Sequence, residues 1–318
     1  MSISNRIIII DAYNLFTRHY VAHPGMSKNG DQVGGVVGFF NNTLRLVERI
    51  NPERVYIVWE GGGSQRKRAI YKDYKKGRKP VKMNRYYEDI PDSLENRNFQ
   101  IQTLVSLISK FPITQIYVEG SEADDAIGYM VKYKLSKQNS IIVSSDHDFY
   151  QLVNKKTIIW SPTLKGFVDT SKVIERFGIH PNNFCLAKSI SGDNSDNIPG
   201  IKGVSYKTLA KYFPKFAEEK DYLLDDFFDD VKKLKQTKKL KILERLSCIF
   251  EENTVRRNWK LVHLDVGNIA HHQIKKIDQK IENYDFAMNN IGAHKLLNES
   301  GILNIDLLKA KILFKNMK

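Results

Sequence analysis

Cysteine is scarce in this chain of 318 residues, which contains only Cys185 and Cys248. Neither belongs to a Cys-Xaa-Xaa-Cys pair or to the Cys/His spacing of a zinc site, so the sequence predicts no structural zinc and no structural disulfide. Long apolar runs are also missing, since none approaches the ~20 residues that a membrane-spanning helix needs. No charged and then apolar leader precedes the first predicted strand. We therefore expect a soluble, cytoplasmic protein of a reducing compartment, without a membrane partner.

Acidic residues are outnumbered by basic ones. The chain contains 50 Lys and Arg against 36 Asp and Glu, which gives a formal net charge of +14 and a pI near 9.5. This excess suits a polyanionic partner such as nucleic acid. A lysine-rich composition without any such partner is the alternative that charge alone leaves open. The chain is long enough for two packed pieces, and its 42% hydrophobic residues are sufficient for a proper core.

The pattern of apolar residues predicts two structural regions. Up to about residue 170, β-branched apolar runs alternate with amphipathic segments, which is typical of βαβ units and a mostly parallel sheet flanked by helices. We expect an α/β domain over 1–170 and a helical part over 171–318. The predicted strands are 6–10, 54–59, 115–118, 140–145 and 157–160. The predicted helices are 34–50, 94–110, 123–136, 172–177, 183–191, 205–213 and 231–250.

Acidic residues follow four of the predicted strands, and two more lie in the later motif GDNSDNIPG. The carboxyl ends of parallel strands meet at one edge of an open α/β sheet, so we expect these acids to converge. Clustered carboxylates repel one another unless cations share the site, and all-oxygen ligands favour Mg²⁺ or Mn²⁺ over zinc. The candidate metal ligands are Asp11, Glu60, Glu122, Asp124, Asp125, Asp146, Asp148, Asp193 and Asp196.

Each acid also has a structural explanation. Asp11 follows a strand and could simply cap the next helix, and acids at 122–125 would favour the positive end of a helix dipole. Three acids within four positions nevertheless exceed what capping requires. Asp146 and Asp148 lie two residues apart in a segment that we expect to be extended, which would point both carboxylates to the same side.

A strongly basic segment follows Glu60. Between Gly61 and Tyr86 it carries ten Lys and Arg residues interleaved with tyrosines: Arg66, Lys67, Arg68, Lys72, Lys75, Lys76, Arg78, Lys79, Lys82 and Arg85. We expect a mobile element that becomes ordered on a phosphate backbone, with Gly61–Gly63 as its hinge. A solvated basic helix face is the alternative.

A glycine-rich turn lies between two predicted helices at IPGIKGVSYKTL, residues 198–209. Gly200 and Gly203 leave backbone N–H groups accessible, and Ser205 is a suitable N-cap for the next helix. Such a turn can bind a phosphate, and Lys202 and Lys207 add positive charge. Its attachment to GDNSDN strengthens an otherwise common pattern.

These motifs, in this order, resemble the 5′-nuclease (flap endonuclease) family. That family includes the 5′–3′ exonuclease domain of bacterial DNA polymerase I and stand-alone bacteriophage 5′-exonucleases and RNase H enzymes. The resemblance covers residues 5 to 265 and depends on IIIDAYNL, YKDYKKGRK, GSEADDAIG, SSDHDFYQL and GDNSDNIPGIKG. It implies a PIN-like sheet domain, a helical arch at about 61–95, and a helix-hairpin-helix-like motif at about 185–213.

The resemblance also implies roles for individual residues. Two Mg²⁺ ions, replaceable by Mn²⁺, are expected: one held by Asp11, Glu60, Glu122 and Asp124, the other near Asp125, Asp146, Asp148 and Asp196, with Asp193 close by. Lys75 and Arg78 are expected to contact the scissile phosphate. A monovalent cation such as K⁺ is expected at the hairpin. The expected nucleic-acid contacts are Arg66, Lys67, Tyr74, Lys76, Lys79, Gly200, Lys202, Gly203, Ser205 and Lys207.

The implied activity is metal-dependent, structure-specific 5′-nuclease action that removes RNA primers and 5′ flaps in DNA replication and repair. The expected partners are flapped DNA and RNA–DNA hybrids, with a single-strand-binding protein or sliding clamp as a candidate, and a monomer is expected. Two positions depart from the family: Glu60 stands where Asp is usual, and Ser205 stands where a third hairpin glycine is usual. The main alternative is a non-catalytic or impaired member that only binds flapped DNA. A toxin-like RNase and a purely structural DNA-binding protein fit the motifs less well.

Overall fold

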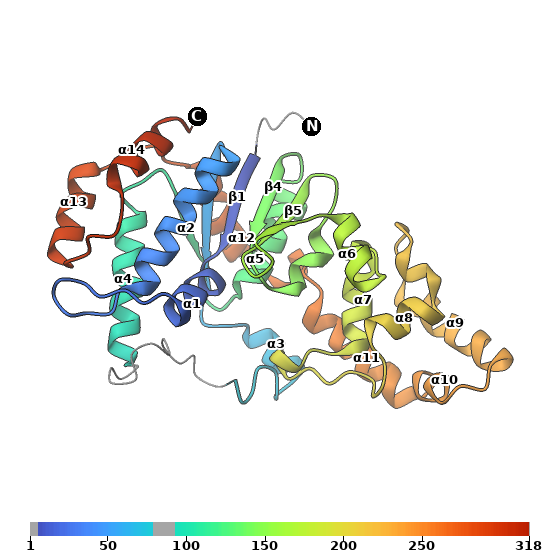
Figure 1. Cartoon of the computed structure of the whole chain (residues 1–318). Coiled ribbons are helices and arrows are strands. Elements are labelled where there is room, and N and C mark those ends of the chain that lie inside the picture. The colour runs from blue at the N-terminus through green and yellow to red at the C-terminus, as the bar shows by residue number, and fades with distance from the viewer. Residues whose placement is uncertain (1–5, 79–92, 318) are drawn as a thin grey trace.

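The fold is built on a six-stranded sheet in the order β3-β2-β1-β4-β5-β6 (Figure 1). The computed structural model describes residues 6–78 and 93–317; Lys79 and the rest of the predicted arch between 79 and 92 lie outside the described residues. All neighbouring strands are parallel except the pair β5 and β6. The strands are β1 (Arg6–Asp11), β2 (Arg54–Trp59), β3 (Thr114–Tyr117), β4 (Asn139–Val143), β5 (Thr157–Ser161) and β6 (Gly166–Val168). The mostly parallel sheet is confirmed.

The four inner strands β1, β2, β4 and β5 are mostly buried on both faces, which explains their continuous apolar sequences. Side chains alternate between the faces of a strand. In β1, Ile8 and Ile10 therefore belong to one hydrophobic cluster, whereas Ile7 and Ile9 belong to the other. The sheet thus separates two cores.

Helices cover both faces of the sheet. The helices that contribute to the first core are α1 (Ala12–Ala22), α2 (Gly34–Ile50), α4 (Leu94–Ile108), α13 (Asn290–Glu299) and α14 (Leu307–Lys315). The second core receives α5 (Ala123–Tyr129), the π-helical turn Met130–Lys134, α7 (Pro181–Ser191) and α12 (His271–Glu282). The helix predicted over 123–136 is therefore α-helical only in its first half. The helices α1 and α12–α14 are not among those predicted.

Further helices extend the molecule away from the sheet (Figure 1). They are α6 (Thr170–Phe177), α8 (Tyr206–Tyr212), α9 (Leu224–Thr237), α10 (Lys241–Leu246) and α11 (Ile249–Val262). The prediction of one helix over 231–250 is wrong, because the chain turns twice there so that Leu243 and Leu246 of α10 become buried. The remaining helical segments are α3 (Gln65–Ile70) and the 3₁₀ turns His147–Leu152, Asn194–Asp196, Pro214–Ala217 and Val266–Asn268.

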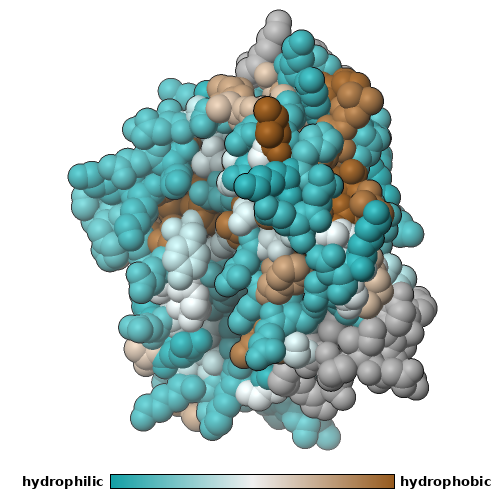
Figure 2. Space-filling view, turned by 90° about the vertical axis from the view of Figure 1, so that its left-hand side faces the viewer, coloured by the Kyte–Doolittle hydropathy of each residue, from teal (hydrophilic) through white to brown (hydrophobic). Residues whose placement is uncertain are grey.

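The C-terminal helices return to the sheet domain, where α13 packs on α4 and α14 packs on α2. Figure 2 views the molecule from this side, and its surface is mainly hydrophilic with separate hydrophobic groups. Exposed apolar side chains of this region include Ile291, Leu303, Leu308 and Ile312. Both cysteines are free thiols, as expected. No helix within the described residues is long and apolar enough to cross a membrane.

One buried amide holds the hairpin region against α7. Asn258 of α11 is fully buried, and its Nδ2 donates to the carbonyl oxygens of Ser189 (2.9 Å) and Pro199 (2.8 Å). Ser189 belongs to α7, and Pro199 begins the glycine-rich turn. A single side chain of α11 therefore links two segments that are 69 and 59 residues away in the sequence.

We predict that Asn258→Ala destabilises the protein by about 1–3 kcal/mol, because two buried carbonyl groups lose their donor. The free energy of unfolding from urea denaturation measures this. The control is Asn298→Ala at an exposed position of α13, which should change stability by less than about 0.5 kcal/mol. Equal midpoints for the two variants would contradict the structural role of Asn258.

Candidate functional site

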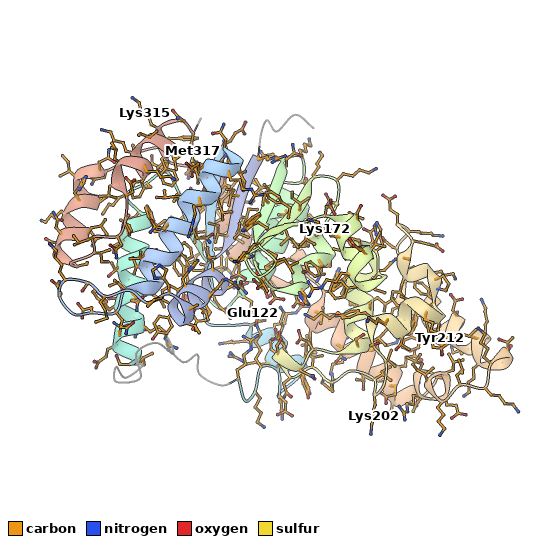
Figure 3. The ribbon with its side chains drawn as sticks, viewed as in Figure 1. Glu122, Lys172, Lys202, Tyr212, Lys315 and Met317 are labelled. Atoms are coloured by element: carbon orange, nitrogen blue, oxygen red, sulfur yellow. The ribbon has the colours of Figure 1, made fainter. Side chains whose placement is uncertain are left out.

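The strand order brings the strand-end acids to one edge of the sheet. Strand β1 lies between β2 and β4, so Asp11 at its end has a neighbouring acid on each side. Glu60 follows β2, and Asp146 lies three residues after β4. The loop after β3 leads to Glu122, which lies between the sheet and α3 in Figure 3. The expected convergence of acids from separate strands is therefore seen in the structure.

Three carboxylates form the tightest group. Oxygen atoms of Asp124, Asp146 and Asp148 all lie within 4.8 Å of one another. The prediction that Asp146 and Asp148 lie in an extended segment is wrong. Asp146 instead caps the 3₁₀ turn His147–Leu152, and its Oδ1 accepts from the backbone N–H of Asp148 at 2.8 Å. The tight turn, rather than strand alternation, brings these two acids together.

Asp11 and Asp124 lie close to Asp146, and neither forms an ion pair with a lysine or arginine of the described residues. Burial, together with the charges of Asp146 and Glu60, raises the pKa of Asp11 to about 7, against hydrogen bonds from the Asn14 N–H and the Ser144 hydroxyl. Burial also raises the pKa of Asp124 well above its usual value, and Asp146 and Asp11 add to this. An all-oxygen site with such repulsion fits a divalent hard cation.

Two of the nine acids are paired with a buried lysine instead. The Nζ atom of Lys67 in α3 lies 2.9 Å from Glu122 Oε2 and 3.1 Å from Asp125 Oδ2. Only 3% of Lys67 is exposed, so its position differs from the predicted surface contact with nucleic acid. The two carboxylates draw the ammonium inward because Asp125 would otherwise be a buried, unpaired charge and Glu122 would keep only the ion pair with Lys75.

The segment after α3 lies across the acids. Lys75 Nζ is 2.7 Å from Glu122 Oε1, and the Tyr74 hydroxyl is within hydrogen-bond distance of both Glu122 and Asp196. Arg78 forms an ion pair with Asp196 and donates to the carbonyl oxygen of Ser195. Burial acts to raise the pKa of Glu122, but Lys67 and Lys75 outweigh it and lower this pKa to about 2.

A second buried lysine was not predicted from the sequence. Lys188 of α7 forms an ion pair with Asp148, and its Nζ lies 2.7 Å from Asp193 Oδ2. Burial raises the pKa of Asp193, but Lys188 outweighs it and lowers the value to about 2. The available signal was a single cation within the apolar run FCLAKSI of a predicted helix.

The nine acids therefore fall into two electrostatic groups. Asp11, Glu60, Asp124 and Asp146 lie where negative charge accumulates, whereas the other five are in ion pairs with Lys67, Lys75, Lys188 or Arg78. Glu122, Asp125, Asp148, Asp193 and Asp196 make up the paired group. This division does not follow the two predicted metal-ligand sets, which remain predictions.

The remaining basic residues lie around this centre. Arg66 donates to the Gly267 carbonyl and to the Asn268 side chain, and Lys76 forms an exposed pair with Asp73. Asn268 also donates to Asp125 at 2.9 Å, which the sequence did not indicate.

The backbone of the glycine-rich turn requires glycine at two positions. A Cβ atom on Gly200 would lie 2.0 Å from the Ser191 carbonyl oxygen, and Gly203 has a φ of +82°. Ser205 caps α8 by accepting from the N–H of Thr208, as predicted. Lys202 and Lys207 are exposed, and Figure 3 shows Lys202 at the outer edge of the molecule.

Gly61 is not free to act as the predicted hinge. Its N–H donates to the Ser121 carbonyl at 3.0 Å, and its own carbonyl accepts from the Gly120 N–H at 2.7 Å. A Cβ atom here would lie 1.7 Å from the Val118 carbonyl oxygen. The end of β2 is therefore fixed to the loop that carries Glu122, and only Gly62 and Gly63 remain candidates for a hinge.

We predict that Lys67→Met destabilises the protein by about 3–5 kcal/mol, because Glu122 and Asp125 lose a shared buried partner. Urea denaturation at neutral pH measures this. Lys76→Met is the matched control, since the Lys76 side chain is 73% exposed and its surface pair contributes at most about 1 kcal/mol. An unchanged unfolding midpoint for Lys67→Met would show that this ion pair adds no stability.

Comparisons with known proteins agree with this architecture. The family model described as "5′-3′ exonuclease, N-terminal resolvase-like domain" matches residues 6–178. The flap endonuclease Xni of Shewanella sp. (strain W3-18-1) is 30% identical over 249 residues, covering 76% of this chain and 87% of that protein. DNA polymerase I of Caldicellulosiruptor bescii is 27% identical over 240 residues, which span 73% of this chain but only 26% of the polymerase.

Solved structures show the same fold. The zinc-bound 5′-exonuclease of bacteriophage T5 has a TM-score of 0.67 at 20% identity, covering 88% of this chain and 99% of that one. The catalytic core of Rad2 in complex with a DNA substrate has a TM-score of 0.51 at 16% identity, covering 99% and 92%. With a family model that matches more than half of its length, this chain belongs to the 5′–3′ exonuclease family with a resolvase-like N-terminal domain.

Proposed function

We propose that this protein is a metal-dependent, structure-specific 5′-nuclease that hydrolyses phosphodiester bonds in flapped DNA. The observation that carries the proposal is the group Asp124, Asp146 and Asp148, with a basic segment lying directly against the neighbouring acids. Carboxylates that bind divalent ions, next to cations that bind phosphate, are what phosphodiester hydrolysis requires. Family membership supports the same reaction class.

The acids are proposed to hold two Mg²⁺ ions, with Mn²⁺ as a substitute. Asp11, Asp124 and Asp146 are the first candidates, because their mutual repulsion would be relieved by a cation. Such ions, when bound, polarise the phosphodiester and favour ionisation of water. The five acids that are paired with Lys or Arg would complete or orient this site.

Lys75 and Arg78 are proposed to bind the scissile phosphate. Lys75 and Arg78 project from one turn towards Glu122 and Asp196, so a phosphate entering the site would meet two cations on the same side. Negative charge that develops on the phosphate during reaction would be stabilised by these groups. Tyr74 lies between both acids and would fix the orientation of this turn.

Substrate binding is proposed to extend beyond the acids. The residues following Gly61 would form the arch, and the turn containing Gly200, Lys202 and Gly203 would grip the duplex, with a monovalent cation such as K⁺. Two similar proteins support DNA as the substrate. One is named flap endonuclease Xni, and the other is the T5 D15 flap endonuclease, whose structure was solved with DNA and metal ions. We further propose that the protein acts on RNA–DNA hybrids and removes primers during replication. Its proposed partner is a sliding clamp or a single-strand-binding protein, and it is proposed to be a cytoplasmic monomer.

A 5′-flapped duplex labelled at either end tests this function, incubated with Mg²⁺ and then with EDTA. We expect cleavage at or near the flap junction that EDTA abolishes. Asp124→Asn/Asp146→Asn should abolish cleavage, whereas the matched control Asp226→Asn/Asp229→Asn, at exposed positions of α9, should retain it. Tight binding without cleavage in either Mg²⁺ or Mn²⁺ would instead identify a member that only binds flaps.

Lys75 and Lys76 provide an internal comparison. We expect Lys75→Ala to lower single-turnover cleavage by about 10²–10³-fold, the usual loss when one donor to a developing charge is removed. Lys76→Ala should lower the rate far less, because its ammonium pairs with Asp73 on the surface. Equal rates for the two variants would contradict a role of Lys75 at the phosphate.

A further inference from the structure

A cavity lined by cations lies apart from the cluster of Asp124, Asp146 and Asp148. It has a volume of about 460 Å³ and is bounded by α1, α2 and the turn between β5 and β6. Arg18 comes from α1, Arg45 and Arg49 lie one helical turn apart on α2, and Lys165 comes from the turn. We call this the basic pocket. Among the residues that the structure describes, no acidic side chain lines it.

The four cations of the basic pocket form no ion pair with any carboxylate within residues 6–78 and 93–317. Arg18 donates to the Thr163 hydroxyl at 3.1 Å, and the Arg49 guanidinium lies 4.6 Å from the centre of the Trp160 ring. The nearest acid along α2, Glu48, pairs with Lys309 of α14 instead. Neutral contacts thus position two of the cations without cancelling their charge.

Two buried polar atoms in the same lining also lack a hydrogen-bond partner among the described residues. These are Nε2 of His19 and Oδ1 of Asn42. Burial, together with the nearby His23, Arg18 and Arg45, lowers the pKa of His19 to about 4, so the imidazole is neutral at pH 7. A neutral imidazole can still donate one N–H. The pocket therefore combines unpaired charge with unused hydrogen-bonding groups.

A chain of hydrogen bonds connects the basic pocket to the carboxylates. Arg18 donates to Thr163, whose hydroxyl donates to Ser145 Oγ at 2.9 Å. Ser145 directly precedes Asp146, and both line the neighbouring cavity that contains Lys188 and Asp193. A strand bound at the carboxylates would therefore have a cationic pocket close to it on the α1–α2 side.

We propose that the basic pocket binds a phosphate group, supplied by a DNA strand beside the carboxylates or by a free phosphate or nucleotide. Arginine forks match phosphate oxygens, and an acid-free lining excludes a cation as the ligand. The site is distinct from Lys75, Arg78 and the hairpin, so it would hold a different phosphate from the one that is cleaved. The inference requires anion binding but does not require the protein to cut DNA.

The variant Arg45→Gln/Arg49→Gln tests the DNA source. Its affinity for a flapped duplex is measured by fluorescence anisotropy without divalent ions, at several KCl concentrations. We expect the affinity to fall about tenfold or more. The slope of log K against log salt should decrease by about 0.9 for each lost phosphate contact. Lys275→Gln/Lys276→Gln removes the same charge from α12, on the other face of the sheet, and should leave the slope close to that of the wild type.

A second measurement tests the free source. The melting temperature of each protein is followed with increasing inorganic phosphate or dATP, after circular dichroism has verified that the variants are folded. Saturable stabilisation of the wild type that Arg45→Gln/Arg49→Gln loses, with an unchanged DNA slope, would assign the pocket to a free phosphate. A variant that matches the wild type in both measurements would overturn the proposal. A protein that fails to cleave but shows the slope change would disprove the nuclease function alone.

Discussion

Repulsion among carboxylates at one edge of the sheet is the constraint to which the surrounding structure responds. Parallel strands deliver acids from distant parts of the chain to the same place, and burial makes their repulsion stronger. Lys67 from α3 and Lys188 from α7 each lie between two of these acids. Lys188 therefore attaches α7 to the turn His147–Leu152 by charge as well as by packing. The acids left without such a partner are those best suited to a metal ion.

The sequence was most informative where local pattern and tertiary environment agree. The apolar strands are recognisable because burial on both faces requires continuous hydrophobic residues, and α2 begins and ends where its pattern does. Predictions were wrong where packing overrode local preference. The lysine-rich stretch after 231 looks like a continuous helix, but burying Leu243 and Leu246 requires it to break. Similarly, the proximity of Asp146 and Asp148 depends on a 3₁₀ turn that strand periodicity does not indicate.

The sequence indicated which acids belong to the candidate site but not which of them form ion pairs with buried lysines. Acids that follow strands can be identified from their position alone. Whether a lysine faces solvent or a buried carboxylate depends on neighbours that only the fold supplies, so Lys67 was assigned to the surface and Lys188 was not identified. The basic pocket could not be predicted from the sequence for the same reason. Arg45 and Arg49 by themselves resemble an ordinary solvated helix face, and only the approach of α1 and the β5–β6 turn places Arg18 and Lys165 beside them.

The position of α7 has a geometric consequence for any DNA bound here. Near its C-terminal end, Lys188 contacts the acids, and the adjacent Ser189 is tied through Asn258 to the start of the glycine-rich turn. The surface proposed to hold the duplex and the acids proposed to cut it are thus held at a fixed separation by α7 and Asn258. The cutting position would be measured from the end of the duplex in nucleotides, independently of the base sequence. A nuclease with this arrangement would recognise the position of a junction and not its base sequence.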